Sequence, residues 1–152
     1  MEPQPIIGAR NRILSLEYAG VIQYSQHSFL VQDLFREVYA DYFRDNSREC
    51  HGHAHQVGEM ISGLGGVPTV EPASIRQATE LTEMLQQDLA LEQEALQAYL
   101  EAINAAADHA PRRQMLEHMA DDEQRAVWHL EKILRQKDFT LTAKEVRLQQ
   151  AR

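Results

Sequence analysis

The sequence predicts an all-α fold, a four-helix bundle with one long crossover between the second and third helices. The 152 residues include only seven glycines and five prolines, which suits long helices better than many short strands. Four segments carry apolar residues at every third or fourth position, the spacing of one helix face. We expect one domain over residues 1–152, with the bundle at about 10–137 and a tail at 138–152.

We call a row of residues three or four apart on one helix face a seam. The first helix is predicted from a seam that runs from Ile13 to Val38. Its members are Ile13, Glu17, Gly20, Tyr24, His27, Val31, Leu34 and Val38. A short turn at about residues 36–40 would join it to the second helix as an antiparallel hairpin. The seam is apolar except near its middle, where polar residues interrupt it.

The second helix is predicted from a seam that begins at Phe43 and ends at Leu64. The sequence GGVP at 65–68 follows, and it supplies a glycine C-cap and a proline stop. The next stretch, VPTVEPAS at 67–74, is extended in character. At about 3.3 Å per residue it can return along the whole bundle, which makes it the long crossover.

The third and fourth helices are predicted from seams that begin at Ile75 and Leu116. Between them, DHAP at 108–111 reads as a turn, with Pro111 in the first turn of the fourth helix. Helices of roughly 25 to 30 residues span about 40 Å, so the four are matched in length. The tail is expected to form a short fifth helix near Thr142.

Charge and segment composition narrow the function classes. The formal net charge is −8, and no run of lysine or arginine stands out, so we expect no nucleic acid partner. The start of the chain has no long apolar core and no membrane-spanning run follows, so we expect no membrane partner and a cytoplasmic location. The single cysteine, Cys50, agrees with a reducing compartment.

Polar residues interrupt the four seams at matching levels. Glu17 and the pair Cys50 and His53 are almost equally far from the first turn. Glu92 and Glu123 are almost equally far from the second turn. If the two hairpins pack centre to centre, Glu17, His53, Glu92 and Glu123 converge inside the bundle.

Three glutamates inside an apolar bundle require a cation, because an unpaired buried carboxylate loses several kcal/mol of solvation or keeps its proton. The four seams contain no lysine or arginine, so the candidates are a metal ion and protonated His53. Carboxylate oxygens with one imidazole suit iron or manganese, and also zinc. The alternative is that one or two of these glutamates lie at the edge of a seam and reach water.

Four stretches resemble one family. They are LEYAGVIQYSQH at 16–27, HAHQVGEMISGLGGVP at 53–68, DLALEQEA at 88–95 and MADDEQRAVWHLEKIL at 119–134. Together they resemble the four helices of bacterioferritins, members of the ferritin-like superfamily, over roughly residues 10–137. The resemblance implies a ferritin-like fold.

The resemblance also implies a function. Bacterioferritins build a di-iron ferroxidase centre in each subunit, assemble about two dozen subunits into a hollow shell and store iron inside it. By position, Glu17 matches the first-helix ligand, His53 the second-helix histidine and Glu92 the third-helix ligand. Glu123 matches the bridging glutamate of the fourth helix, and Tyr24 matches a tyrosine beside the metals. Tyr24 as an ordinary core tyrosine is an equal alternative.

Two positions depart from the family pattern. The second-helix bridging glutamate falls on Cys50, and the fourth-helix histidine falls on Ala126. These departures predict an impaired or mononuclear site and leave open whether the chain is an enzyme with ferroxidase activity. The seam turns Cys50 inward, although a local π-bulge would turn Glu49 inward instead. Cys50 itself is interpreted either as a small buried apolar residue or as a thiolate ligand that favours zinc or copper.

The neighbouring histidines have two interpretations. His51 and His55 lie four residues apart on a different face from His53, where most such pairs meet solvent. His51 also falls where bacterioferritins place the methionine that binds haem, and histidine can ligate haem too. Haem binding at His51 is therefore the alternative.

The sequence as a whole predicts an iron-binding protein for iron storage or homeostasis, with an altered metal site. Iron is the expected metal, with zinc or manganese as alternatives. The expected partner is a second copy or another ferritin-like subunit, in an assembly from a dimer up to a shell. The alternative function is a non-catalytic structural or partner subunit that has lost di-iron chemistry.

Overall fold

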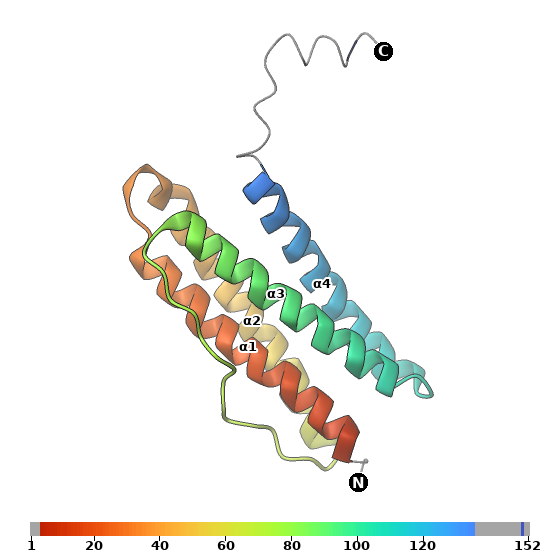
Figure 1. The fold of residues 1–152 in the computed structure, drawn as a ribbon. Coiled ribbons are helices and arrows are strands. Elements are labelled where there is room, and N and C mark those ends of the chain that lie inside the picture. Colours follow the sequence, from red (N-terminus) through yellow and green to blue (C-terminus); the bar gives the residue numbers. More distant parts are fainter. Residues whose placement is uncertain (1–3, 136–149, 151–152) are drawn as a thin grey trace.

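The computed structural model describes residues 4–135 and residue 150, and it confirms a four-helix bundle with one long crossover (Figure 1). The elements are α1 (Gln4–Leu30), the 3₁₀ helix η1 (Asp33–Phe35), α2 (Arg36–Gly63), α3 (Leu81–Ala105) and α4 (Ala110–Arg135). The fifth helix predicted near Thr142 lies outside the described residues.

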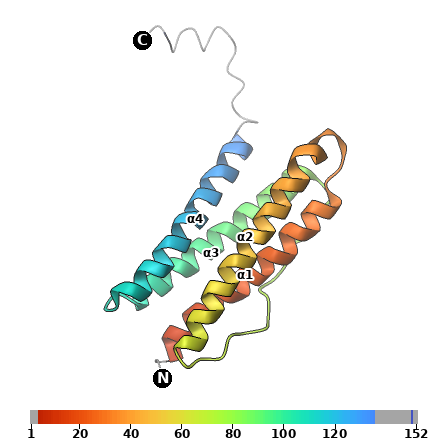
Figure 2. The same cartoon turned by 180° about the vertical axis from the view of Figure 1, so that it is seen from behind.

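The bundle consists of two antiparallel hairpins, α1–α2 and α3–α4, that pack side by side (Figures 1 and 2). α1 packs against both α2 and α3, and α3 packs against α4. Because the crossover returns the chain to the end of the bundle where α1 finished, α3 runs antiparallel to α1. This topology lets residues from the middle of all four helices meet at one level.

Side chains of α1 hold the crossover along its length. Asn11, Ser15 and Gln23 each bond a backbone group of the crossover. The bonds are Thr69 N–H to Asn11 Oδ1 (2.8 Å), Ser15 hydroxyl to Glu71 carbonyl (2.7 Å) and Arg76 N–H to Gln23 Oε1 (3.0 Å). Numbers rise together in both segments, so the crossover runs parallel to α1.

The end of α2 follows the predicted glycine signal. Gly65 has φ 79°, a left-handed conformation that suits glycine. Its N–H bonds the Ser62 carbonyl (3.0 Å), and the Gly66 N–H bonds the Ile61 carbonyl (3.0 Å). These two bonds form a Schellman motif, which satisfies the last carbonyls of α2 and starts the crossover.

The turn between α1 and α2 lies at residues 31–35, so its prediction at about 36–40 was wrong. Leu34 and Val38, expected in the buried seam, are 90% and 67% exposed. The chain turns early at Asp33, which has φ 64°. The Arg36 guanidinium then donates bonds to the carbonyls of Ser28 and Val31 at the end of α1. A tertiary contact of this kind is not visible in helical periodicity.

The core consists of two apolar clusters separated by a polar layer. One cluster surrounds Ile13, Val57 and Leu116, and the other surrounds Phe43, Met84 and Leu130. The polar layer lies between them at the level of Glu17, His53, Glu92 and Glu123. Within the described residues, none of the helices combines the length and the apolar character that crossing a membrane requires.

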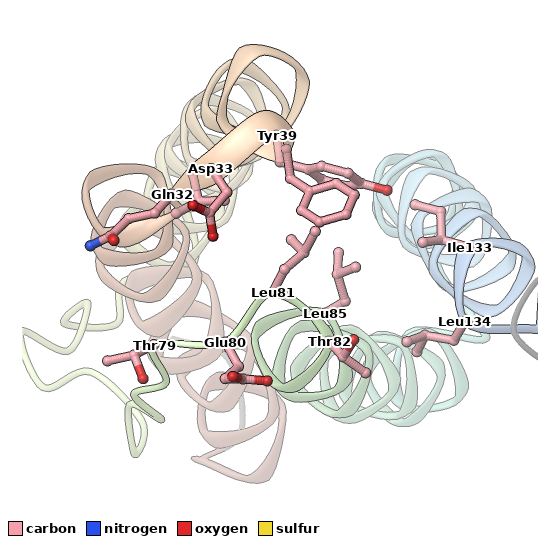
Figure 3. A pocket seen from close by; sticks show the side chains of 12 residues that line it. Gln32, Asp33, Tyr39, Thr79, Glu80, Leu81, Thr82, Leu85, Ile133 and Leu134 are labelled. Carbon is pink, nitrogen blue, oxygen red and sulfur yellow. The ribbon is translucent and has the colours of Figure 1, made fainter.

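One pocket of the bundle lies away from the polar layer. A pocket of about 750 Å³ lies at the end of the bundle where α3 begins (Figure 3). Tyr39, Leu81, Leu85, Ile133 and Leu134 line much of it. None of the buried glutamates or His53 lines this pocket, so the candidate chemistry lies elsewhere.

We predict that Gly65→Ala destabilises the protein by about 1 kcal/mol or more, because alanine is strained at positive φ. Chemical denaturation measures this change. Gly58→Ala is the matched control, because a Cβ there meets nothing within 4 Å inside a helix. It should be neutral or stabilising by up to about 1 kcal/mol. Equal effects of the two variants would contradict the capping argument.

Candidate metal centre

Three side chains from three helices converge in the polar layer. Glu17 of α1, His53 of α2 and Glu123 of α4 each offer a ligand atom, and these atoms lie within 4.8 Å of one another. His53 Nδ1 lies 2.9 Å from Glu123 Oε1 and 3.4 Å from Glu17 Oε1. The three residues are only 2%, 4% and 3% exposed. The structure therefore brings together three of the four residues expected to meet.

Glu92 lies beside this cluster rather than within it. It is buried and shares a hydrogen bond with Glu123. The bond raises the pKa of Glu92 and lowers that of Glu123, as expected if Glu92 holds the proton and donates it. The Tyr24 hydroxyl donates a second bond to Glu92 Oε1, at 2.5 Å. The hydroxyl of Tyr24 thus reaches the layer, as the sequence suggested.

One tyrosine of α1 and one of α3 each bond a carboxyl group of the other helix. Tyr24 follows Glu17 by seven residues and bonds Glu92, while Tyr99 follows Glu92 by seven residues and bonds Glu17. The Tyr99 hydroxyl lies 2.6 Å from Glu17 Oε1. Sequence reasoning missed Tyr99, although its repeated spacing from Glu92 was a signal. The two antiparallel helices therefore orient each other's carboxyl groups.

The protonation of the layer follows from its burial. Burial raises the pKa of Glu17 and of Glu123, and it raises the pKa of Glu92 well above its usual value. Burial alone would lower the pKa of His53, but its bonds to Glu123 and Glu17 raise it to about 11. Of the two cations that the sequence allowed, protonated His53 balances the carboxylates when no metal is bound.

Arg10 is the buried arginine nearest to this layer along α1. It precedes Glu17 by seven residues, or about 10 Å of helix. The predicted seam of the first helix began at Ile13, so it did not include this buried arginine. Its guanidinium bonds Met60 Sδ and the Ile6 carbonyl. The main polar partners of Glu17 are His53 and Tyr99, and those of Glu123 are His53 and Glu92.

The donor set fits one divalent metal ion. Two carboxylates and one imidazole nitrogen converge in a buried place, which suits ferrous iron, manganese or zinc. Ligation through His53 Nδ1 requires that the ring lose a proton, so an ion and a proton compete for this position. Glu17, His53 and Glu123 are the residues that would hold the ion.

Cys50 faces the interior. A Cβ built on Gly20 would lie only 2.5 Å from Cys50 Sγ, so Gly20 provides the space that the thiol occupies. Burial raises the pKa of Cys50 well above its usual value, and the charges of Glu17 and Glu92 raise it further. The thiol is therefore protonated in this environment, and Cys50 does not belong to the convergent ligand cluster.

Glu49 lies toward the surface, on the other side of the His53 ring. Glu49, His53 and Asp122 form a second group whose ligand atoms lie within 4.8 Å, with His53 Nε2 at 3.1 Å from Asp122 Oδ2. Sequence reasoning missed Asp122, because it considered only Glu123 of that pair. A cavity of about 10 Å³, lined by Cys50 and Ala126 among others, lies between the two groups.

The remaining histidines lie apart from the centre. His51 and His55 are exposed on the opposite face of α2, with ring centroids 4.8 Å apart. Haem binding at His51 stays a prediction. His27 is buried, and its Nδ1 lies 3.0 Å from Asp88 Oδ2, as expected for a core histidine.

Comparison with known proteins agrees with this geometry. The family model described as a ferritin-like domain matches residues 8–139. The chain belongs to the ferritin-like domain family. Its polar layer thus lies at the centre of a ferritin-like bundle.

Two solved structures are similar to this ferritin-like chain. A ferritin-like diiron-carboxylate protein from Bacillus anthracis has a TM-score of 0.84 and 29% identity, covering 86% of this chain and 96% of that one. The bacterioferritin of Rhodobacter capsulatus, solved with a metal-free dinuclear site and haem iron, has a TM-score of 0.83 and 28% identity, covering 90% and 88%.

Two curated relatives are also similar. Both are named nutrient stress-induced DNA-binding protein. The one from Synechococcus sp. is 32% identical over 96 residues, 57% of this chain and 54% of the relative. The one from Nostoc sp. is 31% identical over 102 residues, 59% and 54%. The chain thus spans about half the length of the curated relatives it matches.

We predict that the metal-free protein loses stability as pH rises. The folded pKa of His53, about 11, exceeds its ordinary 6.5, so its stabilisation is complete below pH 6.5 and is lost toward pH 11. The raised pKa values of Glu17 and Glu123 act in the same direction from 4.5 upward. The melting temperature in chelator should therefore fall between pH 6 and pH 9.

His53→Gln should remove the part of this decline above pH 6.5, while His118→Gln, at an exposed histidine, should leave it unchanged. A melting temperature of the parent protein that rises over this range would contradict the assignment of His53 as the buried cation.

Proposed function

We propose that this ferritin-like protein binds one ferrous ion per chain at Glu17, His53 and Glu123 and serves iron storage or homeostasis. The observation that carries the proposal is the convergence of their ligand atoms within 4.8 Å in a buried layer between two apolar clusters. The diiron-carboxylate and bacterioferritin structures similar to this chain support iron over manganese or zinc.

The proposed centre is mononuclear because the surroundings of a second ion are depleted. On the ligand side of Glu92 and Glu123, the cavity is bordered by Cys50 and Ala126. Ala126 offers no ligand atom, and the Cys50 thiol, whose pKa is raised by burial, would have to lose its proton before it could bind an ion. The other donors around this cavity, Glu49 and Asp122, lie on the outer side of the His53 ring, so a second ion beside the first would lack the bridging carboxylate and the imidazole that the family resemblance implies there. Ferroxidase activity of the usual di-iron kind is accordingly impaired.

The chain's own residues determine how tightly iron is held. His53 gives up a proton from its ring when the ion arrives, so binding strengthens as pH rises. The Tyr99 hydroxyl fixes the orientation of Glu17, and Tyr24 fixes that of Glu92. Bound ferrous iron supplies the one-electron chemistry of its own oxidation. The apolar clusters on both sides bury the layer, and burial strengthens its electrostatic interactions.

The alternative is a non-catalytic subunit of a ferritin-like assembly. Phe29, Leu34, Phe35 and Val38 are exposed apolar side chains near the α1–α2 turn, which favours contact with another subunit. We propose assembly with copies of this chain or with a related subunit in either case. The two functions differ in whether the buried layer binds iron.

The names of the Synechococcus and Nostoc relatives suggest a DNA-binding function. The formal net charge of −8 argues against it for this chain, because affinity for the phosphate backbone depends on clustered lysine and arginine. We therefore propose iron rather than nucleic acid as the ligand.

Anaerobic titration with ferrous iron tests the proposal. We expect one equivalent per chain in the parent protein and none in the Glu17→Ala/Glu123→Ala variant, because two of three ligands are lost. The matched control, Glu37→Ala/Glu83→Ala, removes two exposed carboxylates and should keep the equivalent. Absence of saturable binding in the parent protein would sink the proposal and favour the non-catalytic subunit.

Restoring the family ligands should restore a second iron. We predict that Cys50→Glu/Ala126→His binds a second ferrous equivalent and consumes oxygen faster than the parent protein. The larger side chains are expected to lower stability by about 1 to 3 kcal/mol, because the local cavity is only about 10 Å³. Cys50→Ala alone should keep one equivalent. Loss of that equivalent would instead make the thiol a ligand.

A further inference from the structure

Histidines on the outer face of α2 form a feature that the buried centre does not use. His51 and His55 are separated by one helical turn, and both are exposed. Their ring centroids lie 4.8 Å apart with an interplanar angle of 66°. Within the part of the chain that the structure describes, the contact given for either ring is with the other ring, and both residues are exposed. The ring nitrogens are therefore available to an external ligand.

We propose that His51 and His55 form a second, surface metal site that takes a late first-row divalent ion, with Cu²⁺ preferred over Ni²⁺ and Zn²⁺. Imidazole nitrogen is a favoured ligand for these ions, and affinity for nitrogen sites rises toward Cu²⁺. The site is independent of the proposed iron centre, which has two carboxylates and lies on the opposite face of the helix.

The geometry matches two-point ligation. Metal–imidazole bonds are about 2.0 to 2.1 Å long, so two nitrogens on one ion lie roughly 3 to 4 Å apart. Ring centroids at 4.8 Å allow this separation with small rotations of the two side chains. The α2 backbone already holds the residues on one face, so binding orders few further groups.

The surroundings leave the site open to a cation. Gly52 follows His51 in the chain, and a Cβ there would meet nothing within 4 Å, so the surface next to His51 is open. Glu59 follows His55 by one more turn and is exposed, which places an acidic residue next along the same face. Arg48, one turn before His51, carries a positive charge that would repel a metal cation. Its Nη1 lies 3.8 Å from Asp45 Oδ1, which offsets this charge.

Copper titration with pulsed electron paramagnetic resonance tests the site. We expect the parent protein to give the signature of two imidazoles on one Cu²⁺. His51→Gln and His55→Gln should each leave one imidazole and weaken binding about 100-fold, since the second ligand acts at high effective concentration. His118→Gln, at a separate exposed histidine, is the matched control and should change neither quantity.

The same measurement in the Glu17→Ala/Glu123→Ala variant separates this site from the buried centre. Retention of the two-imidazole signal there supports the surface site whether or not the iron proposal holds. Circular dichroism confirms that each variant is helical. A signal that is unchanged in both His51→Gln and His55→Gln, or that disappears only with Glu17 and Glu123, would overturn the proposal.

Discussion

The bundle depends on the pairing between His53 and the buried carboxyl groups around it. Glu17, Glu92 and Glu123 lie between two apolar clusters, where an unbalanced negative charge would be costly. Protonated His53 provides the compensating positive charge, because its pKa is raised by Glu123, 2.9 Å from Nδ1, and by Glu17, 3.4 Å from the same atom. The same ring nitrogen is the one proposed to bind the metal once it is deprotonated. Stability without metal and affinity for metal are therefore two aspects of one interaction.

The fold places the residues of this layer at one level by fixing the positions of the helices along the bundle axis. The crossover, held along α1 by side-chain bonds, returns the chain so that α3 runs antiparallel to α1. Antiparallel packing lets Tyr24 reach Glu92 and Tyr99 reach Glu17 over equal spacings. Each carboxyl is thus oriented by a helix other than its own. The level at which four helices meet is fixed by their turns and by these cross-links together.

Much of this arrangement was predictable because periodicity and register are properties of the sequence. The four helices, the glycine end of α2 and the meeting of Glu17, His53 and Glu123 were predictable, but the start of the third helix at Ile75 was wrong. Residues 75–80 continue the crossover, where the Arg76 N–H bonds Gln23, and α3 begins only at Leu81. The early turn at residues 31–35 was not predictable in this way, since Arg36 stabilises it through carbonyls of α1. Asp122 was also missed, because its role depends on the rotamer of His53 rather than on any helical face.

One ion is proposed to bind among Glu17, His53 and Glu123, while Cys50 and Ala126 stand where the resemblance to bacterioferritins implies a second-helix carboxylate and a fourth-helix imidazole for a second ion. Anomalous diffraction from crystals loaded anaerobically with ferrous iron tests it most directly. The account predicts a single strong peak in the buried layer, within about 2.0 to 2.2 Å of His53 Nδ1 and of a carboxylate oxygen from both Glu17 and Glu123. Two buried peaks of similar height, or none, would contradict it.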